Sequence, residues 1–262
     1  MADPTAFYDD LADDYHLNYF DWEASVRRQG KSLARLVRER LGDDGAHTVL
    51  DCSCGIGTQA IGLALQGFDV TATDLSPNAV ARARREAARA GVVIDFSVAD
   101  MRNVAAVVPG TFDIVISCDN SVPHLLTDDD LRLALRNMHE KLKPGGLLII
   151  GIRDYDALVE DRPRFTPPQV VDRADQRSVL FQLWDWAEDG GSYELTMFVH
   201  KQVAGAWDSA IHVARYRALW RAELEQMAGE VRFSGIQWHA ESLTGHHQPL
   251  LTAIRPKTEG RT

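Results

Sequence analysis

The stretch VLDCSCGIGTQAIGLALQGFDVTATDLS, residues 49–76, decides the fold of this chain. It predicts an apolar strand ending at Asp51 and a turn that contains Gly55 and Gly57. A helix follows, and then a second strand that ends at Asp74. The glycines of such a unit let a ligand approach the backbone, and a carboxylate at the tip of the second strand suits the two hydroxyls of a ribose. The unit therefore predicts an adenosine-type cofactor before it says which one.

The turn departs from the dinucleotide fingerprint G-x-G-x-x-G, because Ser53 takes the place of the first glycine and the third glycine is missing. A pyrophosphate held at the helix N-terminus needs that third glycine for close packing, so NAD is disfavoured. Asp74 and Asp100 end successive strands at the same edge of the sheet. Each could be a plain cap or turn residue. Together they fit an adenosine cradle, with Asp74 on the ribose and Asp100 on the adenine amine.

The length and the net charge of the chain limit its possible partners. The chain has 262 residues, 45% of them hydrophobic, and a formal net charge of −10. This length is enough for one large domain or a domain with a sizeable insertion. Because phosphate contacts need a basic face, the acidic balance argues against nucleic acid and anionic membranes and favours a small-molecule substrate. A homo-oligomer is left open.

The cysteines and the N-terminus bear on localisation. Cys52, Cys54 and Cys118 fit a reduced protein better than a disulfide framework, and MADPTAFYDD lacks the basic and apolar regions of a signal peptide. No apolar run approaches the roughly 18 residues that a membrane span needs. We therefore expect a cytoplasmic protein.

Continuous apolar strands alternate with helices up to residue 152, which predicts a parallel sheet covered on both faces. Three strand-like runs between residues 178 and 216 then predict an antiparallel insertion, after which the last two strands rejoin the sheet. The expected divisions are an N-terminal aromatic segment with the first helix, a core, an insertion, a return to the core and a tail, at residues 1–31, 32–152, 153–217, 218–256 and 257–262.

Aromatic residues gather in two places. Residues 5–22 are rich in tyrosine, and these side chains either anchor the segment to the core or form a lid over a ligand. Most of the tryptophans follow residue 180, and strand alternation places Trp184 and Trp186 on one face. Core packing is the default explanation for them. An aromatic-lined pocket would instead favour a flat acceptor such as an indole.

Several motifs together resemble the class I S-adenosylmethionine (SAM)-dependent methyltransferases, and more narrowly the glycine/sarcosine N-methyltransferase group. They are LDCSCGIGT, TATDLS, ADM at 99–101, DNSVPHL at 119–125, LKPGGLLII and IRDYD at 152–156. The resemblance implies a Rossmann-like fold with a seven-stranded, mostly parallel sheet. It also implies SAM as cofactor, S-adenosylhomocysteine as product, and methyl transfer without a metal.

The same resemblance implies roles for individual residues. Arg28 would bind the methionyl carboxylate of SAM, Asp74 the ribose, and Asp100 with Met101 the adenine. The full set implied for the cofactor is Tyr8, Arg28, Asp51, Ser53, Gly55, Gly57, Asp74, Leu75, Asp100, Met101, Cys118, Ser121 and His124. On the acceptor side, the implied catalytic residues are Asn120, His124, Arg153 and Tyr216.

Two groups of residues keep a second explanation. Arg153 matches a substrate carboxylate through its planar fork of donors, but it could equally form a salt bridge with Asp154 or Asp156. His124, His246 and His247 are candidates to line the pocket or to act as a base. Adjacent histidines can also bind a metal, but the sequence offers no third ligand at useful spacing, so we predict no metal.

The leading hypothesis is a methyltransferase acting on the nitrogen of a small amino acid or amine. The alternative within the enzymes is a carbon or oxygen methyltransferase for an aromatic metabolite, which the Trp-rich insertion would favour. A SAM-binding regulator without catalysis is the third possibility, and the retained acceptor-side residues argue against it.

Overall fold

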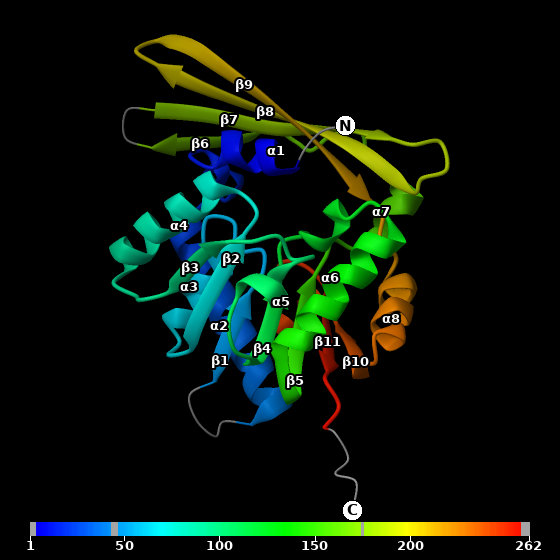
Figure 1. Cartoon of the computed structure of the whole chain (residues 1–262). Helices are drawn as coiled ribbons and strands as arrows, with labels where there is room; N and C mark the ends of the chain where they lie inside the picture. Colours follow the sequence, from blue (N-terminus) through cyan, green and yellow to red (C-terminus); the bar gives the residue numbers. More distant parts are fainter. Residues whose placement is uncertain (1–3, 43–46, 174–175, 258–262) are drawn as a thin grey trace, which may run out of the picture.

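A seven-stranded sheet in the order β10-β11-β5-β4-β1-β2-β3 forms the centre of the protein, in a computed structural model that describes residues 4–42, 47–173 and 176–257 (Figure 1). Neighbouring strands are parallel except at β11, which is antiparallel to both β5 and β10. The arrangement confirms the predicted Rossmann-like fold, with the last two strands returning to the sheet. The strands are β1 (Thr48–Asp51), β2 (Asp69–Asp74), β3 (Asp95–Val98), β4 (Phe112–Ser117), β5 (Leu142–Gly151), β10 (Ser234–His239) and β11 (Leu250–Ile254).

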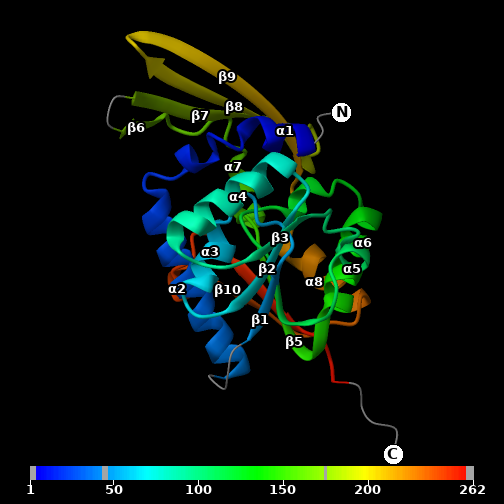
Figure 2. The same cartoon turned by 60° about the vertical axis from the view of Figure 1, so that its left-hand side comes forward.

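Helices cover both faces of this sheet, as the continuous apolar strands predict. One face carries α2 (Trp22–Leu41), α3 (Thr58–Ala64) and α4 (Pro77–Ala90), and the other α5 (Val104–Val107), α6 (Asp128–Lys141) and α8 (Arg221–Glu230) (Figures 1 and 2). The Ser76 side chain caps the start of α4 by accepting a hydrogen bond from the Ala79 N–H. Within the described residues, no helix is both long and apolar enough to span a bilayer.

A second, four-stranded antiparallel sheet lies over the carboxyl ends of the central strands (Figure 1). It consists of β6 (Gln169–Arg173), β7 (Gln176–Trp186), β8 (Ser192–Val203) and β9 (Ala206–Arg217). The insertion is confirmed, but it has one strand more than the three predicted. The prolines at 163, 167 and 168 hid β6, because its five residues follow directly after them.

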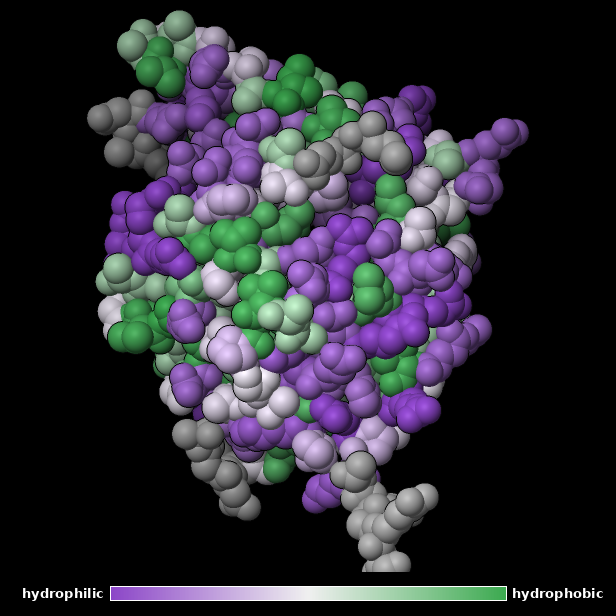
Figure 3. Space-filling model, in the orientation of Figure 1, coloured by the Kyte–Doolittle hydropathy of each residue, from purple (hydrophilic) through white to green (hydrophobic). Residues whose placement is uncertain are grey.

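The inserted sheet has one buried and one exposed face. Along β8, Tyr193, Leu195, Met197 and Val199 are buried and alternate with more exposed residues. Its outer face leaves apolar side chains such as Leu183 and Ile211 exposed, and apolar patches appear at the top of the molecule in Figure 3. The inner face is therefore the one that can contribute to a site.

The N-terminal segment lies between the two sheets. It comprises α1 (Pro4–Leu11) and the short 3-10 helix η1 (Tyr15–Asn18), and α1 contacts both α4 and β9. Asp9 accepts hydrogen bonds from the Ser76 hydroxyl and the Asn78 N–H, and Lys201 on β8 pairs with Asp14. The segment is thus tied to the core and to the insertion at once.

Smaller elements were not predicted. They are α7 (Tyr155–Asp161), α9 (Glu241–Thr244) and the 3-10 helix η2 (Val122–His124). β3 is an edge strand in which only Phe96 is buried. The predicted boundary at residue 31 falls inside α2, which runs unbroken to Leu41.

The closest approach between helices is made by two glycines. A Cβ built on Gly62 of α3 would lie 2.6 Å from the Val26 carbonyl oxygen, and one on Gly30 of α2 would lie 2.2 Å from the Gly62 oxygen. Real Cβ atoms do not approach a backbone oxygen this closely, so the two helix backbones would have to separate.

We predict that Gly62→Ala lowers the free energy of unfolding by about 1–3 kcal/mol, the usual cost of overpacking. Gly229→Ala is the matched control, because a Cβ on this residue of α8 meets no atom within 4 Å and alanine favours helix. Urea unfolding of both variants measures the difference. Equal stabilities would contradict the close approach.

Candidate active site

A cavity of about 350 Å³ opens at the carboxyl ends of β1 to β4, and we name it the core cavity. Carboxyl ends of parallel strands meet at one edge of a sheet, so the polar residues that follow them converge there. Of the predicted cofactor residues, those that line this cavity are Tyr8, Ser53, Gly55, Asp74, Leu75, Asp100, Met101, Ser121 and His124.

Asp74 is buried in the wall of the core cavity with its carboxylate fixed by backbone donors. One oxygen accepts the Gly55 N–H at 2.7 Å and the other accepts the Ser76 N–H at 3.0 Å. Burial raises the pKa of Asp74, although these hydrogen bonds oppose the shift. The Gly55 backbone has φ +52° and so adopts the left-handed region that glycine tolerates best. The turn thus delivers a preoriented acceptor to the cavity.

Asp100 also lines the core cavity, but its carboxylate is already engaged. Arg102 donates to it from Nε and Nη2, the latter at 2.6 Å, and reaches Asp130 on α6 with Nη1. Each carboxylate oxygen can accept more than one hydrogen bond, so Asp100 keeps capacity for a ligand.

Four residues of the predicted cofactor set do not line the core cavity. Arg28 is exposed and lines a different cavity, and Gly57, with φ +95°, begins α3 and packs on Ile61. Cys118 uses its carbonyl to accept the Ser121 hydroxyl at 2.9 Å. Asp51 is buried behind the wall, where it accepts the Ser53 N–H, and burial raises its pKa to about 8. These four residues therefore lie outside the lining of the core cavity.

A second cavity, of about 470 Å³, lies between the core, the N-terminal segment and the inner face of the inserted sheet, and we name it the inserted-sheet cavity. Arg153 and Tyr216 line it, as predicted for the acceptor side, together with Gln182, Leu195 and Met197. Tyr8, Tyr15 and Asp119 line both cavities, so the two spaces share a wall.

Arg153 is held by aromatic residues of the insertion. Its Nη1 donates to the Tyr193 hydroxyl at 2.6 Å, and its guanidinium lies 4.7 Å from the Trp184 ring centroid and 5.3 Å from that of Tyr216. Among the described residues, no carboxylate forms an ion pair with Arg153. The alternative salt bridge is wrong, because Arg221 pairs with Asp154 at 2.7 Å and with Asp156 at 3.3 Å.

His124 lies in η2 against two tyrosines. Its Nε2 is 2.8 Å from the Tyr8 hydroxyl, and its ring centroid is 4.1 Å from that of Tyr216. Burial, helped by the nearby charge of Arg153, lowers the pKa of His124 to about 3. The ring is therefore neutral at physiological pH.

Asn120 lines neither cavity, contrary to the position predicted beside the substrate. It is buried with φ +65°, and its side-chain oxygen accepts the Arg153 N–H at 3.1 Å. Asn120 therefore positions the backbone of Arg153.

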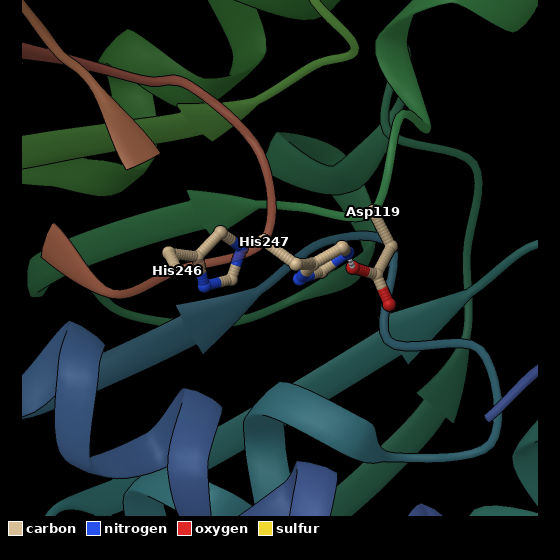
Figure 4. Close-up of side chains that lie close together, drawn as sticks. All are labelled: Asp119, His246 and His247. Atoms are coloured by element: carbon tan, nitrogen blue, oxygen red, sulfur yellow. Dashed lines mark ion pairs between the residues drawn. The ribbon is translucent and has the colours of Figure 1, made fainter. Parts of the chain in front are cut away.

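Sequence reasoning missed Asp119. Its side chain accepts the Tyr19 hydroxyl at 2.6 Å, and the His247 Nε2 lies 2.9 Å from its other oxygen (Figure 4). Asp119 belongs to the motif DNSVPHL, but the position beside the substrate was assigned to its neighbour Asn120. Only the folded chain brings the loop before β11 beside the end of β4.

In the folded chain, Asp119 provides the third possible metal ligand beside His246 and His247, which the sequence did not reveal. One ligand atom each of Asp119, His246 and His247 lies within 4.8 Å of the others. His246 is fully buried, neither of its ring nitrogens has a hydrogen-bond partner, and burial lowers its pKa to about 4. In Figure 4 the His247 ring lies between His246 and Asp119 and directs a nitrogen at the carboxylate.

A sheet of this order with a ligand cavity at its strand ends defines the class I methyltransferase architecture. A family model described as "Methyltransferase domain" matches residues 49–146, from β1 into β5. The segment of residues 49–146 is therefore similar to a methyltransferase domain.

Curated relatives of the chain include glycine and glycine/sarcosine N-methyltransferases. The chain is 40% identical over 140 residues to a glycine/sarcosine N-methyltransferase of Parasynechococcus marenigrum, a match that covers 53% of this chain and 48% of the relative. It is 36% identical over 126 residues to the glycine N-methyltransferase of Rattus norvegicus, covering 44% and 43%. The matched segment thus spans about half the length of such relatives.

Solved structures share the whole fold. DesVI of Streptomyces venezuelae superimposes with a TM-score of 0.79 over 94% of this chain and 98% of its own, at 21% identity. The sugar N-methyltransferase KedS8 of Streptoalloteichus gives a TM-score of 0.72 at 21% identity and covers 88% of each chain. At this identity the likeness concerns the fold.

The residues of the core cavity fit SAM. A buried carboxylate at Asp74 matches a ribose diol, and the apolar side chains of Leu75 and Met101 line the same cavity as Asp100, which suits an adenine ring. A Cβ on Gly55 would meet no atom within 4 Å, so this backbone faces open space.

We predict that Asp74→Asn weakens binding of S-adenosylhomocysteine by about 10- to 150-fold, the equivalent of one charged hydrogen bond. Asp69→Asn at the exposed start of the same strand is the control and leaves affinity unchanged. Isothermal titration calorimetry measures both variants. Wild-type affinity in Asp74→Asn would refute the ribose role.

A second prediction concerns pH. Between the folded-state pKa of His124 near 3 and its ordinary value near 6.5, the unfolded chain binds a proton that the folded chain does not. The free energy of unfolding therefore rises with pH in this window, by up to about 1.4 kcal/mol per pH unit for one group. His124→Gln reduces that slope, as measured by urea unfolding at pH 4.5, 5.5 and 6.5. Identical slopes would show that His124 titrates normally.

Proposed function

We propose that the protein transfers the methyl group of SAM to the nitrogen of a small amino acid or amine metabolite that carries a carboxylate. The core cavity holds the cofactor, and the inserted-sheet cavity holds the acceptor. The glycine/sarcosine N-methyltransferases among the relatives support this acceptor class.

The observation that carries the proposal is the unpaired guanidinium of Arg153. The Arg153 side chain is half-buried, and a cation partly withdrawn from water without a counter-ion costs free energy that a bound carboxylate would recover. Arg153 presents this charge to the inserted-sheet cavity, while Tyr193, Trp184 and Asn120 fix its position. A planar guanidinium binds a carboxylate with two parallel hydrogen bonds, which also orients the acceptor.

The shared wall supports the chemistry. When bound, SAM supplies a methyl group on a positively charged sulfur. Displacement at this carbon needs an aligned lone pair and exclusion of water more than acid or base assistance. Tyr8 and Tyr15 close the region between the cavities and bring apolar surface to it. The N-terminal aromatic segment thus serves as both anchor and lid.

The aromatic-metabolite alternative receives less support. Of the described tryptophans, none lines either cavity, and Trp184 stacks on Arg153 and Tyr193 instead. Trp184 therefore supports the proposed carboxylate site rather than a slot for an indole. A non-catalytic regulator would not need an acceptor cavity beside the cofactor.

A panel of acceptors tests the proposal. We expect release of S-adenosylhomocysteine with glycine, sarcosine or another small amino acid, and none with indoles or phenols. Turnover of aromatic acceptors alone would replace this function with the alternative, and no turnover across the panel would favour the regulator.

We predict that Arg153→Met lowers kcat/KM for the amino acid acceptor by about 10- to 150-fold, because one charged hydrogen-bonding partner is lost. Binding of S-adenosylhomocysteine stays intact, since Arg153 does not line the core cavity. Arg164→Met, at an exposed position near the insertion, is the control. Unchanged activity in Arg153→Met would exclude binding of the acceptor carboxylate by Arg153, which we name the carboxylate clamp.

A further inference from the structure

Asp119 occupies the boundary between the two cavities. Among the described residues, it is the acidic side chain that lines both the core cavity and the inserted-sheet cavity. Arg153 lines only the second of these. An acceptor held by Arg153 in the inserted-sheet cavity must therefore present its reactive atom at the wall that contains Asp119.

The backbone forces Asp119 into this position. Asp119 and Asn120 have φ angles of +56° and +65°, so two successive non-glycine residues lie in the left-handed region directly after β4. Such strain persists only where surrounding contacts fix it, and it is common at ligand sites. Here Asn120 is fixed by the Arg153 N–H and by its own N–H bond to the Gly151 carbonyl. The same turn thus places Asp119 and holds the backbone of Arg153.

The carboxylate is charged and oriented. Its side chain is 13% exposed, and burial alone would favour the neutral acid. The hydrogen bond and charge of His247, with the Tyr19 hydroxyl, outweigh burial and hold the pKa of Asp119 well below its usual range. Tyr19 and His247 contact different oxygens of the carboxylate, so the carboxylate is held in one orientation. A fixed negative charge at this wall is a site for a cation.

We propose that Asp119, oriented by Tyr19 and His247, binds the amino group of the acceptor. It pairs with the ammonium form on arrival and, after that group has released one proton to solvent, accepts a hydrogen bond from the neutral amine, so that the nitrogen lone pair faces the core cavity. This inference rests on the proposed function and narrows it. Arg153 takes the carboxylate and Asp119 the amine, so the acceptor carries both groups on a short skeleton. Amines without a carboxylate, and acids without an amine, meet only half of the site.

Two other uses of Asp119 predict different behaviour. As a structural tie to the loop before β11, it would affect every ligand of the inserted-sheet cavity equally. As a metal ligand with His246 and His247, it would make binding depend on a divalent ion.

The experiment compares two isosteric probes on protein saturated with S-adenosylhomocysteine. Sarcosine carries an ammonium and a carboxylate, whereas methoxyacetate has an ether oxygen in place of the ammonium. Calorimetry measures both in 1 mM EDTA and again in 0.1 mM zinc chloride. We expect Asp119→Asn to weaken sarcosine by about tenfold or more and methoxyacetate by less than about twofold. Arg153→Met should weaken both probes.

Asp185→Asn, an identical charge change at an exposed position of β7, is the matched control and leaves both affinities unchanged. If Asp119→Asn does not fold, Tyr19→Phe replaces it, because loss of the 2.6 Å bond loosens the carboxylate and weakens sarcosine selectively.

Several results would overturn the inference. Equal weakening of both probes by Asp119→Asn would show that Asp119 only holds the loop before β11 in place. Sarcosine binding that requires zinc would identify a metal site. Failure of wild-type protein to bind sarcosine would exclude the paired amine and carboxylate sites. The proposed carboxylate clamp is judged separately, by the response of methoxyacetate to Arg153→Met.

Discussion

The proposed acceptor side of this protein depends on the solvation of one half-buried guanidinium, that of Arg153. Removing a cation from water is expensive, and without a counter-ion the cost must be offset by oriented dipoles and aromatic faces. The inner face of the inserted sheet supplies them from three strands, with Trp184 on β7, Tyr193 on β8 and Tyr216 on β9. The pairing Trp186↔Tyr193↔Tyr216 fixes two of these rings side by side. The strand register of the insertion therefore places these aromatic rings beside the Arg153 guanidinium.

The central fold was predictable because its signals are local. Apolar strands, the Ser76–Pro77 helix start and the glycine turn each act within a few residues, and together they permit few arrangements. β6 and α7 were not predictable, because five and seven residues beside prolines carry little periodic signal. Their positions depend on pairing with β7 and on packing against the core.

The site was predictable in part for the same reason. Asp74, Asp100 and Ser121 follow strands of the parallel sheet, so topology alone brings them to the core cavity. Arg28 does not line the core cavity and Asn120 lines neither cavity, because the spacing of a motif does not reveal which way a side chain turns. The partnership of Asp119 with Tyr19 and His247 joins residues 100 and 128 positions apart, and no pattern in the sequence connects them.

The wall shared by the two cavities has a thermodynamic consequence. The two cavities are both lined by Tyr8, Tyr15 and Asp119. A ligand that orders these side chains in one cavity therefore changes the conformational entropy that a ligand loses when it binds in the other cavity. Any such effect is reciprocal, since the factor by which one ligand alters the affinity of the other is the same in both directions. In the proposed assignment of the two cavities, the cofactor and the acceptor therefore change each other's binding affinity. The N-terminal segment between the cavities carries this effect.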